Sequence, residues 1–477
     1  MLLKNLLENV KVIKLQGNEN LECNDIAINS KLVTDKSLFI CLKGNKFDGS
    51  AFVNEAIENG ANVIVCEKEI VCDATCVVVE NARKALSSIA SNFYGKPSNL
   101  MRIISVVGTN GKSTTAYIIY NLLKNYGIKA ALIGTMYVEY DGIRKESTMT
   151  TPDPIELNCM FKDMCQVGVR YVVMEVSAHA IFYQKLYGIK SFVKVFTNFS
   201  QDHLDFFKNM DDYRKCKQSF FLEKDNSIHV INMDDNLGVE LIKKSKNETI
   251  TYGLSNPSDV FCIDIENKSD GSGYILNLFD SIMDISSKFF GRFNVYNTMA
   301  AAIVAKLCGV KDYSIEQTLS LLKPPEGRFN VFEINKVKYI VDFAHTPDGL
   351  FNLLKEAKKI SRGKMITIFG CGGDRDTSKR AIMGRIAKNM SDIVILTSDN
   401  PRTEKKEAII EDILQGITNK DNLLIEVDRK KAIALGSKIA NDGDIVLIAG
   451  KGSESYIEEN NTFIPYSDIQ EVSNLSV

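Results

Sequence analysis

Val106-Val107-Gly108-Thr109-Asn110-Gly111-Lys112-Ser113-Thr114 is the stretch of sequence that decides the fold. A buried β-type run (103–107) precedes its glycines and a helical pattern (113–126) follows them, which predicts a tight strand-to-helix turn. Gly108 and Gly111 let backbone N–H groups point at phosphate oxygens. Lys112 adds a cation for terminal phosphates, and the Ser113 hydroxyl can ligate Mg²⁺. Although Val106 stands where the strict P-loop has a glycine, this phosphate loop (residues 108–114) predicts ATP binding.

Apolar runs alternate with helical patterns on both sides of the phosphate loop. Downstream, the runs 130–133, 171–176 and 192–197 are bounded by glycines and helices, which is typical of a parallel sheet covered on both faces. The last third repeats the alternation, and its five apolar runs predict an open doubly wound sheet with strands at 339–343, 365–369, 393–396, 423–427 and 445–449.

Two boundaries divide the chain. Gly95-Lys96-Pro97-Ser98 closes a small α/β segment with strands at 37–42 and 61–66 and a helix at 53–59. Pro324-Pro325-Glu326-Gly327 ends a helix, because adjacent prolines cannot continue it. We therefore expect an α/β protein with three domains, 1–98, 99–326 and 327–477, of which the central one is a P-loop ATPase domain and the last is Rossmann-like.

Composition narrows the class of protein. The 477 residues, 45% hydrophobic and 25% charged, are those of a globular protein. Lys+Arg 58 against Asp+Glu 60 gives a net charge of -2, so no affinity for nucleic acid is expected. Eleven cysteines without a C-x-x-C motif predict reduced thiols and a cytoplasmic protein. Residues 1–14 are spaced as on a short amphipathic helix, and no apolar run is long enough to span a membrane.

Polar residues follow two of the central strands. Glu175 and His203 come at or after the carboxyl ends of neighbouring predicted strands, the edge where ligands bind in an open α/β sheet. We therefore expect both to approach a nucleotide-bound magnesium ion. His179 is a weaker candidate, and His229, inside the apolar run 228–231, is expected in the core.

Nine motifs carry a resemblance to a known family. In chain order they are GTNGKST, MEVSAH, TNFSQDHLD, GRFNVYN, GRFN, DFAHTPD, GCGGDRD, SDNPRTE and GKGSE. A sequence with these motifs in this order resembles the Mur ligases, over about residues 25–470. The resemblance implies an ATP-dependent carbon–nitrogen ligase of peptidoglycan precursor synthesis that forms ADP and phosphate, and the motifs are most similar to those of its diaminopimelate-adding members.

The resemblance assigns a reaction and its catalytic residues. The γ-phosphoryl group of ATP passes to a carboxylate, here the D-Glu side chain of UDP-N-acetylmuramoyl-L-Ala-D-Glu, and an amine displaces phosphate from the acyl phosphate. Lys217, in the family's Y-x-x-x-K element, is the implied carbamylated lysine, whose oxygens help Ser113, Glu175 and His203 hold two Mg²⁺ ions. By residue type alone Lys217 is a solvated helix lysine. The implied catalytic set is Lys112, Glu175, His203, Lys217, Arg328 and Asp342.

Further ATP contacts are implied on both sides of the double proline. Asn294 and Asn297 correspond to positions near the adenine, and Arg328 and Asp342 to positions that reach ATP from the linker and third domain. His345 follows in the same motif. Because Arg328 and Asp342 lie beyond the boundary, closure of the domains is expected to assemble the site.

The sequence Asp399-Asn400-Pro401-Arg402 is expected to choose the amine. A guanidinium can hold the distal carboxylate of meso-diaminopimelate through two parallel hydrogen bonds. Lysine lacks that carboxylate and is expected to leave Arg402 buried and unpaired, at a cost of ~1–3 kcal/mol. The resemblance completes the pocket with Arg375, Gly450 and Glu454, and Glu454 and Asp399 suit an ammonium group.

The muramyl-nucleotide end departs from the family pattern. Asn29-Ser30-Lys31 stands where Asp-Ser-Arg is usual, and Tyr183 and Lys185 replace a usual Gln and Arg. Lysine keeps the charge of arginine but lacks its planar guanidinium, so we expect weaker or altered binding of the donor nucleotide. Ser453 also replaces a usual histidine. The implied donor-binding residues are Ser30, Asn45, Lys46, Thr150, Thr151, Ser177, Tyr183 and Lys185.

Three other functions stay open. The same chemistry on lysine, another amine or another donor is the nearest, and a regulatory paralogue that binds ATP or precursor without ligating is the second. Folate-type polyglutamate ligases share the phosphate loop but lack the DNPR and GCGGDRD motifs. The expected partners are small molecules only (UDP-muramyl dipeptide, meso-diaminopimelate and ATP), and the expected state is a monomer.

Overall fold

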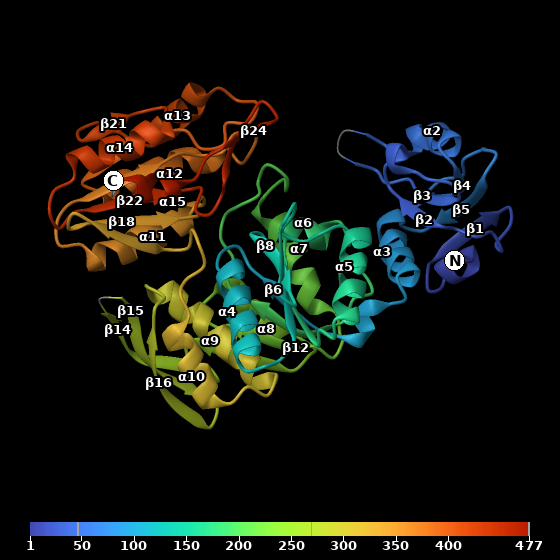
Figure 1. Ribbon diagram of the computed structural model, residues 1–477, viewed down its shortest axis with the longest axis horizontal. Helices are drawn as coiled ribbons and strands as arrows, with labels where there is room; N and C mark the ends of the chain where they lie inside the picture. The colour runs from blue at the N-terminus through green and yellow to red at the C-terminus, as the bar shows by residue number, and fades with distance from the viewer. Residues whose placement is uncertain (45–46, 269, 476–477) are drawn as a thin grey trace. The chain divides into compact units, whose positions relative to one another are not determined.

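The structure is a computed structural model that describes residues 1–44, 47–268 and 270–475 (Figure 1). By its internal contacts the chain forms two compact units. The first combines Met1–Ser105, Ile128–Lys194 and Lys224–Ser227, and the second combines Val106–Gly127, Val195–Glu223 and Ile228–Val477. The phosphate loop therefore belongs to the same unit as the C-terminal third of the chain.

The N-terminal sheet has the order β1-β5-β4-β3-β2, with β1 antiparallel to β5 and the others parallel. Alternate residues of β4 face two cores: Val63 and Val65 pack on the side of α3, and Ile64 and Cys66 on the side of α2. The predicted strands and helix are confirmed to within two residues. The elements are β1 (Val12–Gln16), β2 (Asp25–Ala27), β3 (Ser37–Ile40), α2 (Val53–Glu58), β4 (Ala61–Cys66), β5 (Thr75–Val79) and α3 (Ala82–Phe93).

The N-terminus differs in part from its prediction. Only α1 (Leu3–Leu6) is helical, and the following residues form β1. Leu15 pairs with Val77 of β5, so this stretch gains strand hydrogen bonds at the sheet edge. The apolar residues of this stretch have helical spacing, but hydrogen bonding to the distant strand β5 determines its structure instead.

The central sheet has eleven strands in the order β16-β15-β14-β13-β12-β11-β6-β10-β7-β8-β9. Its predicted inner strands are confirmed: β6 (Arg102–Val107), β7 (Ala130–Ile133), β10 (Tyr171–Val176) and β11 (Ser191–Phe196). Antiparallel strands, which the sequence pattern does not predict, extend this parallel sheet at both edges. There β8 (Tyr137–Tyr140) and β9 (Ile143–Glu146), and β14 (Val260–Lys268), β15 (Gly271–Leu278) and β16 (Ser281–Ser287), pair antiparallel. Short connections without a crossover helix allow only that arrangement.

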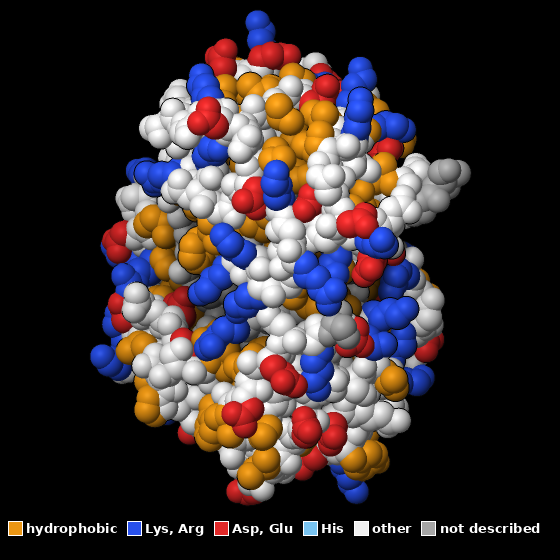
Figure 2. All heavy atoms as spheres, turned by 90° about the vertical axis from the view of Figure 1, so that its left-hand side faces the viewer, with side chains coloured by type: hydrophobic (Ala, Val, Ile, Leu, Met, Phe, Trp, Pro, Cys, Tyr) orange, Lys and Arg blue, Asp and Glu red, His pale blue; other side chains and the backbone are white. Residues whose placement is uncertain are grey.

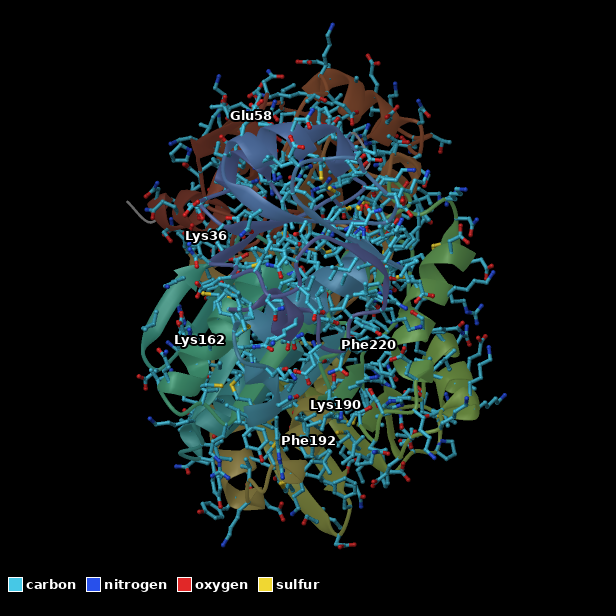
Figure 3. All side chains as sticks on the ribbon, turned by 90° about the vertical axis from the view of Figure 1, so that its right-hand side faces the viewer. Lys36, Glu58, Lys162, Lys190, Phe192 and Phe220 are labelled. Carbon is cyan, nitrogen blue, oxygen red and sulfur yellow. The ribbon has the colours of Figure 1, made fainter. Side chains whose placement is uncertain are left out.

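The remaining central elements pack on this sheet. His229 lies fully buried on β12 (Ile228–Asn232), with Ser245 Oγ 3.0 Å from its Nδ1, as expected of a core histidine. In the first unit the Arg102 guanidinium lies 4.7 Å from the ring centre of Phe192, which Figure 3 labels. The other elements are α4 (Lys112–Asn125), α5 (Pro154–Gln166), α6 (Ala178–Phe182), α7 (Met210–Leu222), α8 (Asn236–Lys244), β13 (Thr249–Gly253), α9 (Arg292–Leu307) and α10 (Asp312–Leu321).

The C-terminal sheet has the order β17-β18-β22-β19-β20-β21, parallel except for β17. One face packs on α11, α12 and α13 and the other on α14 and α15, so the predicted doubly wound sheet is confirmed. A hairpin, β23 (Tyr456–Glu459) and β24 (Thr462–Pro465), follows the last strand. The elements are β17 (Asn330–Ile334), β18 (Val337–Asp342), α11 (Pro347–Ile360), β19 (Met365–Phe369), α12 (Ser378–Met390), β20 (Ile393–Leu396), α13 (Lys406–Leu414), β21 (Leu423–Ile425), α14 (Arg429–Ile439), β22 (Ile445–Ala449) and α15 (Asp468–Asn474).

The state of the cysteines and the distribution of surface charge agree with what the composition predicts. All eleven cysteines are free, as predicted. On the face drawn in Figure 2, lysine and arginine side chains are interspersed with acidic and apolar ones. Within the described residues we find no helix with both the length and the apolar character needed to cross a membrane.

Candidate functional site

Two glycines shape the phosphate loop. Gly111 precedes α4 with φ +83°, a conformation that L side chains rarely adopt. A Cβ at Gly108 would overlap the Thr197 hydroxyl, which donates a hydrogen bond to the Asn110 carbonyl at 2.7 Å. The loop therefore approaches the end of β11 as closely as only glycine allows.

Two lysines lie against the carbonyls of this loop. Lys112 Nζ donates to the carbonyls of Gly108 at 3.1 Å and Thr109 at 2.8 Å. Lys217 Nζ, from α7, donates to the Gly108 carbonyl at 2.7 Å and lies 4.9 Å from the ring centre of Tyr213. The Lys217 side chain is buried, unlike that of a solvated helix lysine. Burial, together with the charge of Lys112, lowers the pKa of Lys217 well below its ordinary value.

The segment after the double proline reaches the phosphate loop. Arg328 Nη2 donates to Ser113 Oγ at 3.1 Å. Asp342 accepts backbone hydrogen bonds from Phe329 at 2.8 Å and Ala344 at 2.7 Å, and burial raises its pKa. Arg328 thus contacts the phosphate loop directly. Asp342 instead fixes the backbone next to Arg328, at Phe329, and the backbone after β18, at Ala344.

Gly327 ties the same segment to the loop after β22. Its φ is +69°, and a Cβ there would overlap the backbone of Gly452 and Ser453. Its carbonyl accepts a hydrogen bond from the Phe343 N–H at 2.9 Å. The linker therefore packs against the GKGSE loop with no room for a side chain.

The first turn of α11 also contacts the phosphate loop. Asn110 Nδ2 donates to Asp348 Oδ2 at 3.0 Å, and Thr346 Oγ1 lies 3.4 Å from Asn110 Oδ1. Burial raises the pKa of Asp348. Together with Arg328, these contacts connect the predicted third domain to the residues expected to bind ATP.

An acidic side chain organises the loop that carries His203. Asp202 Oδ2 lies 3.4 Å from His203 Nε2 and 3.8 Å from His345 Nε2, and its Oδ1 lies 3.6 Å from Lys379 Nζ. Although burial opposes it, hydrogen bonding to His345 and the three neighbouring cations hold the pKa of Asp202 well below its usual range. His203 itself has a left-handed φ of +57°.

Asn294 and Asn297 are buried on α9. Asn297 Nδ2 donates to Asn294 Oδ1 at 2.9 Å, and Asn297 Oδ1 accepts from Thr115 Oγ1 of α4 at 3.1 Å. Asn294 Nδ2 donates to the Phe290 carbonyl at 2.8 Å. The pair therefore joins α9 to the helix that begins at the phosphate loop, beside Gly111.

Glu175 lies in the first unit at the end of β10. Its Oε1 accepts from the Thr135 N–H at 2.8 Å, and its Oε2 from the Thr135 hydroxyl at 3.1 Å. The Thr151 hydroxyl donates to the Glu175 carbonyl at 2.9 Å and accepts from the Ser177 N–H at 3.1 Å. Thr150 joins the group through Thr135 Oγ1 at 3.1 Å. Four predicted residues, Glu175, Thr150, Thr151 and Ser177, are thus brought to the carboxyl end of one strand.

The other donor-site candidates of the first unit have protein partners. Lys185 Nζ pairs with Asp153 Oδ1 at 2.8 Å and donates to the Thr151 carbonyl at 3.1 Å. The Arg83 guanidinium stacks 4.0 Å from the ring centre of Tyr183. Ser30 Oγ donates to Glu55 Oε2 at 2.7 Å. Asn45 and Lys46 lie outside the described residues.

Arg402 follows β20 and is held by the hairpin after β22. Its Nε pairs with Glu458 Oε2 at 2.8 Å, and its Nη1 donates to the Gly373 carbonyl at 2.8 Å. The side chain is 18% exposed. The expectation that lysine leaves this guanidinium buried and unpaired is therefore wrong, because a glutamate 56 positions later supplies a partner. Arg375 is exposed, and its Nη1 lies 3.2 Å from the Asp374 carbonyl.

The rest of the predicted amino-acid pocket is a buried network. Glu454 Oε2 accepts from Lys451 Nζ and from Asn400 Nδ2, each at 2.8 Å. Lys451 is fully buried and also donates to Asn400 Oδ1 at 2.8 Å. A Cβ at Gly450 would press on the Asp399 carboxylate, and Pro401 is buried beside them. The ammonium group of Lys451 therefore lies beside Glu454, where an ammonium group of the substrate was expected.

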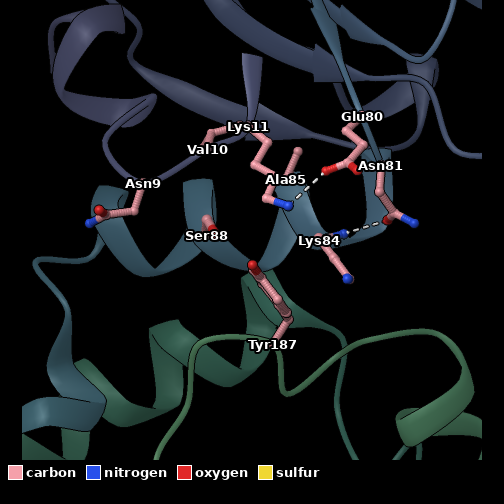
Figure 4. A pocket seen from close by; sticks show the side chains of 9 residues that line it. All are labelled: Asn9, Val10, Lys11, Glu80, Asn81, Lys84, Ala85, Ser88 and Tyr187. Carbon is pink, nitrogen blue, oxygen red and sulfur yellow. Dashed lines mark hydrogen bonds and ion pairs between the residues drawn. The ribbon is translucent and has the colours of Figure 1, made fainter. Parts of the chain in front are cut away.

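Sequence reasoning missed several residues that the structure places at these sites. Thr135 donates hydrogen bonds to Glu175, and Asp348 accepts one from Asn110. Asp202 contacts both His203 and Lys379, and Glu458 pairs with Arg402. Asp202 and Asp348 had a signal, since they stand in the TNFSQDHLD and DFAHTPD motifs. A separate hollow in the first unit contains no predicted site residue; Asn9, Val10, Lys11, Glu80, Asn81, Lys84, Ala85, Ser88 and Tyr187 line it (Figure 4).

Family comparisons agree with this geometry. The Mur ligase catalytic domain matches residues 22–94, the Mur ligase middle domain residues 106–305, and the Mur ligase glutamate ligase domain residues 327–452. The chain belongs to the Mur ligase family. It is an ATP-dependent ligase of mixed α/β architecture.

Within the Mur ligase family, the chain is similar to proteins that share one name. UDP-N-acetylmuramoyl-L-alanyl-D-glutamate–2,6-diaminopimelate ligase of Aquifex aeolicus is 41% identical over 450 residues, which cover 94% of this chain and 93% of that protein. The ligase of the same name from Alkaliphilus oremlandii is 40% identical, covering 99% and 98%. A solved structure of a ligase of that name matches with TM-score 0.71 and 29% identity, covering 100% of this chain and 98% of the other.

Proposed function

We propose that the chain joins meso-diaminopimelate to the D-Glu side-chain carboxylate of UDP-N-acetylmuramoyl-L-Ala-D-Glu in peptidoglycan precursor synthesis, with release of ADP and phosphate. The observation that carries the proposal is the meeting of Lys112, Lys217 and Arg328 at the phosphate loop. Two cationic side chains, Lys112 and Arg328, and a buried lysine around glycine-shaped backbone N–H groups suit a triphosphate that transfers its terminal phosphoryl group. The named relatives at about 40% identity support the same reaction.

In this proposal each of the three domains binds one substrate. Residues 1–98 bind the UDP-muramyl donor, 99–326 bind ATP, and 327–477 bind the amino acid. Donor contacts come from Ser30, Thr150, Thr151, Ser177, Tyr183 and Lys185. Since Lys185 is already oriented by Asp153, it can present its ammonium where the family usually has an arginine.

The ATP contacts come from the loop and its neighbours. The loop N–H groups and Lys112 bind the phosphates, while Arg328 and Asp342 position them from the third domain. Asn294 and Asn297 set α9 against α4 and thereby shape the adenine side of the site. Lys112 and Arg328 balance charge as the carboxylate attacks and ADP leaves.

Magnesium suits the residues present. Ser113 and Glu175 offer oxygen and His203 offers nitrogen, and no cluster of three or more His, Cys, Asp or Glu side chains among the described residues forms a ready-made site. Mg²⁺ commonly takes one or two protein oxygens and completes its shell with nucleotide phosphates and water. Bound Mg²⁺ would neutralise phosphate charge, with Ser113, Glu175, His203 and carbamylated Lys217 as the proposed ligands.

Lys217 has the properties that carbamylation requires. Its lowered pKa favours the neutral amine, whose lone pair forms the N–C bond to CO₂ with loss of one proton. The product is an anion next to the phosphate loop, where oxygen ligands are useful. Intact-mass measurement in bicarbonate, compared with acid-treated protein, tests for one added carboxyl group.

One experiment tests the function. The purified protein is given ATP, Mg²⁺ and UDP-muramyl dipeptide with either meso-diaminopimelate or lysine, and phosphate release is measured. We expect turnover with diaminopimelate. Absence of diaminopimelate-dependent phosphate release overturns the proposal and favours a binding protein.

Lysine is the second candidate substrate, favoured by one observation. Because Glu458 already pairs with Arg402, a substrate without a distal carboxylate leaves no unpaired guanidinium. Turnover with lysine alone assigns the reaction to that amine. We further propose a cytoplasmic monomer, in keeping with the free thiols, which light scattering tests directly.

A further inference from the structure

Arg402 offers a carboxylate two possible faces. A guanidinium binds a carboxylate bidentately through Nε and one Nη, or through both Nη atoms. Glu458 takes Nε and the Gly373 carbonyl takes Nη1, each at 2.8 Å. Glu458 therefore occupies the face that contains Nε, and the Gly373 carbonyl shares Nη1 of the other face. A substrate carboxylate that binds through Nε must replace Glu458.

The Gly373 carbonyl is the harder partner to move. The Gly373 N–H donates to the Asn400 carbonyl at 2.9 Å, and a Cβ on Gly373 would overlap the Pro401 backbone. The Glu458 carboxylate, by contrast, ends a flexible side chain that is 23% exposed. An incoming carboxylate also repels Glu458 but not a neutral carbonyl.

The backbone of Arg402 is positioned without the Glu458 side chain. Its N–H donates to the Glu458 carbonyl at 3.0 Å, and its carbonyl accepts from the Asn460 N–H at 2.8 Å. These two backbone bonds anchor Arg402 to the β23–β24 hairpin in a left-handed conformation with φ +51°. Removing the Glu458 carboxylate leaves both bonds in place.

We propose that Glu458 is a specificity-determining placeholder: its carboxylate pairs with Arg402 before the amino acid binds, and the distal carboxylate of the substrate displaces it. This inference rests on the proposed function. Exchange of one carboxylate for another keeps Arg402 neutralised throughout. It also weakens selection against lysine, because lysine leaves the Arg402–Glu458 pair intact.

Glu458→Ala and Glu458→Gln test the placeholder, with Glu459→Gln as the matched control. Glu459 is the next residue of the same strand and has its own ion pair with Lys406 at 2.8 Å. Removing the competitor should lower the KM for meso-diaminopimelate by roughly three- to tenfold at unchanged kcat, more in Glu458→Ala than in Glu458→Gln. The preference for diaminopimelate over lysine should rise in proportion, and Glu459→Gln should match the wild type.

An unchanged or higher KM for diaminopimelate in both variants overturns the placeholder and makes Glu458 a positioning residue. Thermal unfolding shows whether Glu458→Ala folds; if it does not, Glu458→Gln decides. A wild-type protein without diaminopimelate turnover refutes the proposed function instead. The wild type and the variants thus report on the two proposals separately.

Discussion

The phosphate loop and the amino-acid pocket hold their cations in opposite ways. At the loop, Lys112 and Lys217 donate to backbone carbonyls. In the pocket, Lys451 and Arg402 are paired with carboxylates, Glu454 and Glu458. Carbonyl dipoles leave a net positive charge, whereas carboxylates cancel it.

This difference matches what each site is proposed to bind. A triphosphate brings several negative charges, and a loop with net positive charge attracts it. A zwitterionic amino acid brings balanced charge, so a pocket of prearranged ion pairs selects it by exchanging partners. In this proposal the phosphate loop attracts its ligand by net charge, and the amino-acid pocket recognises its ligand group by group.

The largest effect is expected at the phosphate loop. Lys112→Met should lower kcat by about 10²- to 10³-fold, because the loop loses a positive charge that stabilises the phosphoryl group during its transfer. ADP release measures this loss. Lys124→Met, at the other end of α4, is the control and should be unaffected. A near-normal kcat in Lys112→Met would show that the positive charge of the phosphate loop does not contribute to phosphoryl transfer.

Arg402→Ala should affect only the doubly carboxylated substrate. Loss of a charge-assisted bidentate contact should reduce kcat/KM for meso-diaminopimelate by roughly ten- to a hundredfold. The kcat/KM for lysine should stay near the wild-type value, which provides an internal control. Equal losses with both amines would instead mean that Arg402 supports the fold of the pocket.

Asn110→Ala tests the contact between the loop and α11. Losing the hydrogen bond to Asp348 should raise the KM for ATP roughly two- to tenfold, since one side-chain contact that orients the loop is removed. Steady-state kinetics at varied ATP concentration measure it. An unchanged KM for diaminopimelate would confine the effect to the phosphate side, and an equal rise for both would contradict the prediction.

The smallest effect is on stability, and its sign should differ between the sites. In CO₂-free buffer Lys217→Met should stabilise the fold near pH 7 by on the order of 1 kcal/mol, because the unfolded lysine binds a proton that the buried one resists. Since the folded pKa lies below the ordinary 10.5, wild-type stability rises with pH in this range, and the advantage should vanish toward pH 10.5.

Lys451→Met is the matched comparison. It should destabilise the protein, because Glu454 loses its charged partner. Urea unfolding at several pH values measures both variants. A change of the same sign in the free energy of unfolding of both variants would show that carbonyl and carboxylate partners stabilise a buried lysine equally well.

The inner strands of the fold were predictable because they are fully buried. β4, β7, β10, β19, β20 and β22 match their predicted bounds. The edge strands were not predictable: in β16, Ile282 is 75% exposed, so its apolar pattern carries no clear face. Such strands form because a neighbour offers hydrogen-bonding groups, which a local pattern does not reveal.

The site was predictable where adjacent residues share a motif. Gly108, Lys112 and Ser113 stand together in the sequence, as do Asp399 and Arg402. Glu458 and Asp348 gain their roles only through folding, since each meets a partner far along the chain. A carboxylate in a strand or in the first turn of a helix looks like an ordinary solvated side chain until its partner is known.

Gly327 has a consequence for how this ligase can change over time. Because a Cβ at Gly327 would overlap the Gly452 and Ser453 backbone, any larger residue there would push the connection after the double proline away from the GKGSE loop. We therefore expect a substitution in this short connector to disturb the proposed amino-acid pocket and to alter substrate preference, which limits how the connector can evolve.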